Sequence, residues 1–226
     1  MRTAEGAGSG DSRGSADETA TRYGGRSGGQ PLTEGRRAAT RMEIARAAIG
    51  LFIVKGVAAT SAEEIAGAAG ISVRTLWRYF PTKEGSVLPL LTAGVDVAAS
   101  ALRSWPPGRP VAELLDDMNR RGADLRPDVR TVVELVRLTR TEPGLRAVWL
   151  QAHDAAEPVF AEMLAQRAGI PAPDLPTTVQ AAVVNSALRV AVEHYAFHGD
   201  PAAPDDGGLM KAVGAALATV GRGLSP

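Results

Sequence analysis

The chain has 226 residues, with 25 basic and 25 acidic side chains, 45% hydrophobic residues, 4% aromatic residues and no cysteine. This length allows one large domain or two small ones, and the absence of cysteine excludes disulfides and cysteine-based metal or nucleophile sites. No apolar run reaches the roughly 18 residues needed to span a membrane, so we expect a cytoplasmic protein without a membrane partner.

The N-terminal segment, 1–35, contains nine glycines and few large apolar side chains. It cannot bury enough surface to offset its ordering entropy, which predicts a disordered tail. After it, apolar residues recur at helical spacing and predict a first helix over 36–55 that ends near Gly56. These residues are Ile44, Ala48, Leu51 and Phe52.

A second helix is predicted up to about Ala69, with Thr60 or Ser61 as its N-cap. Gly70 then supplies a turn residue that tolerates positive φ, and a short third helix runs to Phe80. Ala66 is small where two steeply crossing helices need a close approach of their backbones. This pattern predicts a helix-turn-helix, in which the third helix is held rigidly by a buried turn.

A fourth helix is expected to begin at Lys83, and Pro89 should kink it or restart it. The remaining sequence also predicts helices, separated by proline-containing loops. Their approximate ranges are 110–122, 128–141, 143–169, 178–199 and 209–223. The predicted fold class is therefore all-α, with a helix-turn-helix domain over 36–84 and a second helical domain over 85–226.

Positive charge is concentrated in the segment that contains the predicted helix-turn-helix. Residues 36–84 carry eight basic and four acidic side chains, a net charge of +4, whereas residues 85–226 carry 13 and 16, a net charge of −3. Such a field indicates a polyanionic partner, although a solvated charged face gives the same pattern. Candidate DNA-contacting residues are Arg41, Thr60, Ser61, Ser72, Val73, Arg74, Thr75, Trp77, Arg78, Tyr79 and Lys83. Arg74 can pair bidentately with guanine or with a phosphate.

Residues 36–84 resemble the DNA-binding domain of the TetR family of bacterial repressors. The resemblance covers LFIVKGVAATS, then EEIAGAAGIS, then RTLWRYFPTKE. It implies an all-helical homodimer whose divergent C-terminal domain binds a small ligand and sets the spacing of two recognition helices. The chain departs from the family at Trp77, where a tyrosine is usual, and at Gly85-Ser86, where an apolar residue is usual.

The C-terminal domain offers candidates for an effector pocket and for a dimer interface. Pockets are mostly apolar with a few polar groups, which selects Trp105, Met118, Trp149, His153, Phe160 and Met163. Core packing is the alternative for each of them. The resemblance also implies that the last two helices, which have apolar faces, pair with their copies in a dimer interface; ordinary intrachain packing is the alternative. Its candidate residues are Val183, Ser186, Val190, His194, Phe197, Val213, Ala216 and Val220.

The favoured function is a ligand-responsive transcriptional regulator, a repressor that binds a palindromic operator in double-stranded DNA as a homodimer. A small, largely hydrophobic effector would release it. An enzyme is disfavoured because no triad spacing, phosphate-binding glycine loop or metal-ligand cluster is present, and we expect neither cofactor nor metal. The alternative is a ligand-binding protein with non-specific or architectural DNA contact.

Overall fold

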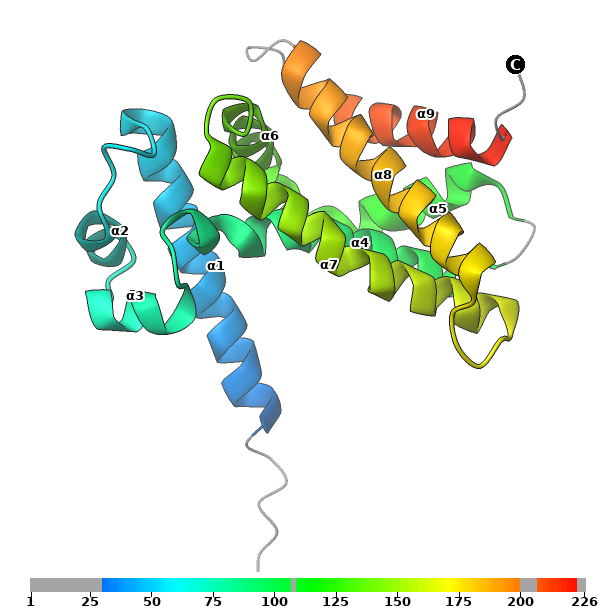
Figure 1. The fold of residues 1–226 in the computed structure, drawn as a ribbon, viewed down its shortest axis with the longest axis horizontal. Helices are drawn as coiled ribbons and strands as arrows, with labels where there is room; N and C mark the ends of the chain where they lie inside the picture. Colours follow the sequence, from blue (N-terminus) through cyan, green and yellow to red (C-terminus); the bar gives the residue numbers. More distant parts are fainter. Residues whose placement is uncertain (1–29, 107–108, 200–206, 223–226) are drawn as a thin grey trace, which may run out of the picture.

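The computed structural model describes residues 30–106, 109–199 and 207–222, and every regular element in these ranges is a helix. The predicted all-α fold is therefore confirmed for the described chain. Figure 1 shows a small helical lobe at one end and a larger helical lobe extending from it. Most of the predicted disordered tail, residues 1–29, lies outside the described residues.

The small lobe consists of α1 (Gln30–Lys55), α2 (Ala62–Ala68) and α3 (Val73–Tyr79). Helix α1 begins six residues before the predicted start at Arg36. Pro31 is compatible with this earlier start, because the N–H groups of a first helical turn have no intrahelical partner. The helix ends as predicted at Gly56, whose φ is +84°.

The connection to the larger lobe is a short 3-10 helix, η1 (Glu84–Val87), followed by α4 (Leu88–Ser104). The helix that was expected to begin at Lys83 therefore starts as a 3-10 helix, and an α-helix follows from Leu88, directly before Pro89. This residue lies in the first turn of α4, where proline is tolerated, so the helix restarts there as the sequence suggested.

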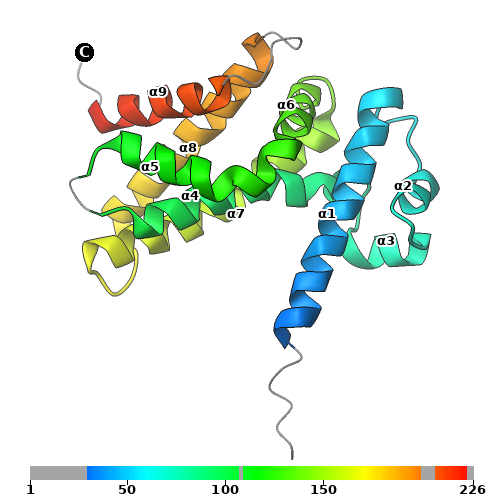
Figure 2. The same cartoon turned by 180° about the vertical axis from the view of Figure 1, so that it is seen from behind.

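The larger lobe follows the predicted order of helices. Their bounds are α5 (Val111–Arg121), η2 (Gly122–Asp128), α6 (Val129–Leu138), α7 (Pro143–Ala168), α8 (Leu175–His198) and α9 (Gly208–Arg222). The 3-10 helix η2 was not predicted, and Pro158 lies inside the continuous α7. Figures 1 and 2 show α8 between α7 and α9, and α8 contacts both helices.

Two apolar cores hold the fold together. The first joins the small lobe to the larger one, because Ile49 of α1 and Leu76 of α3 belong to the same buried cluster as Val136 of α6 and Leu145 of α7. The second lies at the far end of the larger lobe and includes Phe160. The two lobes therefore share the first core, whereas the second belongs to the larger lobe alone.

The segment Glu84–Ser104 is long and apolar enough by composition to cross a membrane, with a mean hydropathy of 1.5 over an 18-residue window. This corrects the expectation that no apolar run in the sequence is long enough to span a membrane. Leu90, Leu91 and Leu102 of this segment are buried in the two cores. Such burial is typical of the central helix of a globular protein.

Gly70 shapes the turn between α2 and α3 through its backbone conformation alone. Its φ is +67°, and a Cβ atom built on it meets nothing within 4 Å. We expect Gly70→Val to lower the free energy of unfolding by at least about 1–2 kcal/mol, because a β-branched residue is strained at positive φ.

Gly67→Val is the matched control, since Gly67 is helical and a Cβ there is also unobstructed. It should change the free energy of unfolding by less than about 0.5 kcal/mol. Both values are measured by urea denaturation, and equal effects at the two positions would contradict the turn assignment.

Candidate nucleic-acid interface and effector cavity

Side-chain caps fix both helices of the helix-turn-helix. The Ser61 hydroxyl accepts from the Glu64 N–H at 3.2 Å, and the Glu64 carboxylate accepts from the Ser61 N–H at 2.8 Å. The Ser72 hydroxyl accepts from the Thr75 N–H at 3.1 Å at the start of α3. These short helices therefore begin at fixed residues, because their first N–H groups have partners.

Helix α3 has a buried side and an exposed side. Leu76 and the following Phe80 are buried in the first core. The exposed side presents Ser72, Arg74, Trp77 and Arg78, whereas Val73, Thr75 and Tyr79 are half-buried at its edges. The exposed side of a rigidly held helix is the part of this motif that can enter a major groove.

Basic groups lie on and beside this exposed side. Arg74 forms no ion pair with any residue that the structure describes. The guanidinium of Arg41, on α1, lies 5.3 Å from the centre of the Phe80 ring, and that of Arg78 lies 5.4 Å from the Tyr79 ring. A cation–π contact positions an arginine without neutralising it, so these charges stay available to phosphates.

Two residues that were predicted to contact phosphates, Thr60 and Lys83, form hydrogen bonds within the protein. Thr60 is buried, and its hydroxyl donates to the Gly56 carbonyl at 2.8 Å, so it cannot reach a phosphate. The Lys83 ammonium donates to the carbonyls of Val57 and Thr60 at 2.7 and 3.0 Å. Lys83 therefore anchors the loop before α2 to the start of η1, with two of its three N–H groups already used.

The larger lobe contains a partly open cavity of about 440 Å³. Its wall comes from α4, α5, η2, α6, α7, α8 and the start of α9, and it is mostly apolar. Both its size and its composition are typical of small-molecule sites. Three of the predicted pocket residues line it, namely Met118, Trp149 and His153.

The other three predicted pocket residues do not line the cavity. Phe160 and Met163 are buried in the second core, beyond the cavity along α7. Trp105 packs at the edge of that core, and the Arg167 guanidinium lies 4.2 Å from the centre of its ring. Helical periodicity indicated that these side chains point inward, but not that α7 passes from the cavity into a filled core.

Residues that the sequence did not single out complete the cavity. Helix α4 contributes a stretch that includes Ala93, Gly94 and Ala98, and small side chains leave space there. Asp128 lines the wall and is itself 7% exposed. The sequence feature that could have identified Asp128 was an acidic residue directly before the α6 segment.

Asp128 also forms an ion pair with the small lobe. Its two carboxylate oxygens accept from Nε and Nη2 of Arg46, on α1, at 2.9 and 2.6 Å. This bidentate geometry is stronger and more directional than a single contact. The cavity wall is therefore attached directly to the helix that supports α3.

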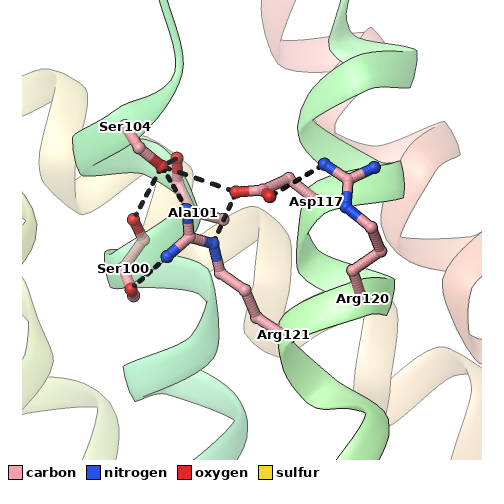
Figure 3. A network of polar contacts seen from close by, with 6 residues as sticks. All are labelled: Ser100, Ala101, Ser104, Asp117, Arg120 and Arg121. Carbon is pink, nitrogen blue, oxygen red and sulfur yellow. Dashed lines mark hydrogen bonds and ion pairs between the residues drawn. The ribbon is translucent and has the colours of Figure 1, made fainter.

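A surface network holds α5, one wall of the cavity, against α4. Figure 3 shows Asp117 between Arg120 and Arg121, with Arg121 also reaching Ser100 and Ser104 of α4. The Arg121 guanidinium donates to these two hydroxyls at 3.0 and 2.7 Å. Three hydrogen bonds thus connect the two helices, two from Arg121 and one from the Ser104 hydroxyl to Asp117.

The predicted dimer residues divide by helix. On α8, Val183, Ser186, Val190 and His194 are exposed, together with Leu175 and Val179 on the same side. Phe197 is half-buried beneath the Arg140 guanidinium, at 5.0 Å. On α9, Val213 is buried in the second core and lines the cavity, so intrachain packing accounts for it. Ala216 and Val220 are half-buried.

Comparison with known proteins places both lobes in one family. Residues 44–86 match the family of bacterial regulatory proteins of the tetR type, and residues 106–225, more than half of the chain, match the MftR C-terminal domain. The chain is 28% identical to the transcriptional regulator TcmR of Streptomyces glaucescens over 63% of its own length and 66% of that protein. It is also 28% identical to the regulator MftR of Mycobacterium tuberculosis, over 84% of this chain and 93% of that protein.

Solved structures share the fold. A TetR-family regulator from Mesorhizobium loti aligns with a TM-score of 0.50 at 22% identity, over 81% of this chain and 96% of that one. The fatty acid degradation regulator FadR from Bacillus halodurans aligns with a TM-score of 0.52 at 18% identity, over 82% and 96%. The family matches at both ends of the chain, joined to the helix-turn-helix geometry, show that this protein belongs to the TetR family of transcriptional regulators, which are not enzymes.

Proposed function

We propose that this protein is a cytoplasmic, ligand-responsive repressor that binds a palindromic operator as a homodimer and is released by a small, largely apolar effector. The observation that carries the proposal is the position of Asp128. This residue belongs to the wall of the cavity and also pairs with Arg46 of the DNA-binding lobe. A molecule in the cavity therefore acts on the helices that would contact DNA.

In the proposed complex, α3 enters the major groove, and its exposed arginines contact different parts of the DNA. Arg74 lies in the first turn of α3, where recognition helices contact base edges, and we assign it to a base. Arg78, Trp77 and Arg41 lie toward the other end of the helix or on α1, and we assign them to phosphates. Such contacts fix the orientation of the protein on the duplex.

Release follows from a shift between two arrangements of the lobes. An effector that fits better when η2 and α6 move outward favours a displaced Asp128, and Arg46 carries that displacement into α1. The shared core transmits the same movement, since α1 contacts α4, α6 and η1. A tenfold loss of operator affinity requires only about 1.4 kcal/mol of preference between the two arrangements.

The exposed side of α8 supports the homodimer. Leu175, Val179 and Val190 are 77%, 52% and 52% exposed, which is unusual for aligned aliphatic side chains on one helix. A second copy of the same face would cover them in a symmetric interface. Two recognition helices can then bind successive major grooves, which a monomer cannot do.

The proposed function is tested by selection from random duplex DNA at physiological salt. We expect the purified protein to enrich a palindrome with two half-sites. A folded protein that retains DNA without enriching any sequence would instead support the non-specific alternative, whose affinity follows phosphate contacts alone.

Arg74→Ala should weaken binding to the selected operator by about 1–3 kcal/mol, because a base contact is lost. Binding to random duplex DNA should change much less. Fluorescence anisotropy measures both affinities, and Arg222→Ala removes the same charge from the end of α9 as a control. Equal losses on both DNAs would assign Arg74 to a phosphate.

The double substitution Val183→Asp, Val190→Asp should convert the dimer to a monomer, because four like charges would face one another across the symmetric interface. Sedimentation equilibrium measures the mass. Val54→Asp is the control, since Val54 is 85% exposed on α1, outside the proposed interface. A double variant that keeps the dimer mass would place the interface elsewhere.

The Arg46–Asp128 pair is tested by a double-substitution cycle with Arg46→Gln and Asp128→Asn. We expect each single change to weaken operator binding by about three- to tenfold, and the double variant to be no weaker, since either change breaks the same link. Lys55→Gln breaks the ion pair with Glu64 inside the small lobe and serves as the control. Additive losses, or no loss, would show that the pair does not orient α1.

A further inference from the structure

One polar group in the cavity wall has no partner among the described residues. His153 is 5% exposed and lines the cavity, and its Nε2 atom is buried without a hydrogen bond. Asp128 is engaged by Arg46, and Asn119, also in the wall, has a contact of its own. A buried nitrogen that lacks a partner costs free energy unless a bound molecule supplies one.

The surroundings of His153 fix which of its ring nitrogens carries the proton. The Asn185 amide nitrogen donates to the His153 backbone carbonyl at 2.8 Å and lies 3.3 Å from a Glu157 carboxylate oxygen. Two acceptors on that side orient the amide, so its oxygen faces His153 Nδ1, at 2.7 Å. Nδ1 must therefore be the donor, and Nε2 of the neutral ring is an acceptor.

The ring stays neutral at ordinary pH. Burial lowers the pKa of His153, and the charge of Arg189 acts in the same direction. The hydrogen bond from His153 to Asn185 and the carboxylates of Glu193 and Glu157 oppose this shift, but burial is the larger effect. A neutral imidazole with its proton on Nδ1 has a lone pair at Nε2, not a second N–H.

A contact with the Trp149 ring also fixes the orientation of the His153 ring. The Trp149 ring meets it edge to face, with centroids 4.2 Å apart and an interplanar angle of 83°. The Trp149 indole N–H in turn donates to Glu193 at 2.7 Å, and Arg189 also donates to that carboxylate. The rings of His153 and Trp149 are therefore both held by residues outside the cavity wall, which is the arrangement of a pre-organised site.

We propose that His153 Nε2 accepts a hydrogen bond from the effector, which is therefore a predominantly apolar molecule bearing a hydroxyl or N–H donor, such as an alcohol or a phenol. This inference rests on the proposed function, because it assigns the chemistry of the effector that the cavity binds. The rest of the wall near His153 is apolar, including Leu188 and Val192. A molecule that offers only acceptors leaves Nε2 unpaired and is bound less tightly.

The test compares two probes of nearly the same shape, 4-octylphenol and its methyl ether, by isothermal titration calorimetry at neutral pH. We expect the phenol to bind at least about tenfold more tightly, because the ether has no donor. Equal affinity would overturn the inference and leave effector binding intact. Binding of neither probe would overturn the inference and also count against the cavity as the effector site.

Two further measurements make the assignment specific to His153. His153→Phe should remove the preference for the phenol, whereas His198→Phe, at an exposed histidine at the end of α8, should keep it. Nitrogen NMR of labelled histidine in the unaltered protein should show the Nδ1–H form, and Nε2 should shift when the phenol binds. An Nε2–H form in the free protein would overturn the proposal even if the variant fails to fold.

Discussion

The small size of the DNA-binding segment is the constraint on which the rest of the structure depends. A segment of about 50 residues buries too little surface to be securely stable by itself. Here Ile44, Ile49 and Phe52 of α1 lie in one core with Val136 and Leu145 of the larger lobe. Because the same side chains stabilise both lobes, any rearrangement of the larger lobe changes the packing of α1.

The cavity also results from the way in which the helices pack. Small residues on α4 leave space between helices that Phe160 and its neighbours fill further along α7. Polar groups in that space must then be satisfied, and the structure does so from outside, through Arg46, Asn185 and Glu193. Among the described residues of the cavity wall, His153 Nε2 lacks such a partner, which connects the packing of the wall to the chemistry of the molecule that it binds.

Local signals in the sequence predicted most of the fold. Gly56, Gly70 and the serine caps end or begin helices through interactions within a few residues. At these positions the predicted helix bounds agree closely with the observed ones. The cavity was predicted only in part, because periodicity shows that a side chain is buried but not against what. His153 and Phe160 are seven residues apart on one helix, yet one faces the cavity and the other a filled core. The partner of Asp128 lies 82 residues away, beyond any local pattern.

The shared core also bears on how regulators of this kind can be recombined. A chimera joined between Glu84 and Gly85 would cut at the end of the helix-turn-helix sequence but through the middle of a packed cluster. The foreign α1 would then have to complement Val133, Val136 and Leu145 as well as carry its own recognition helix. A chimera should therefore include the parts of α6 and α7 that pack in this core together with the DNA-binding segment. The operator preference is then transferred with the surface that supports α1.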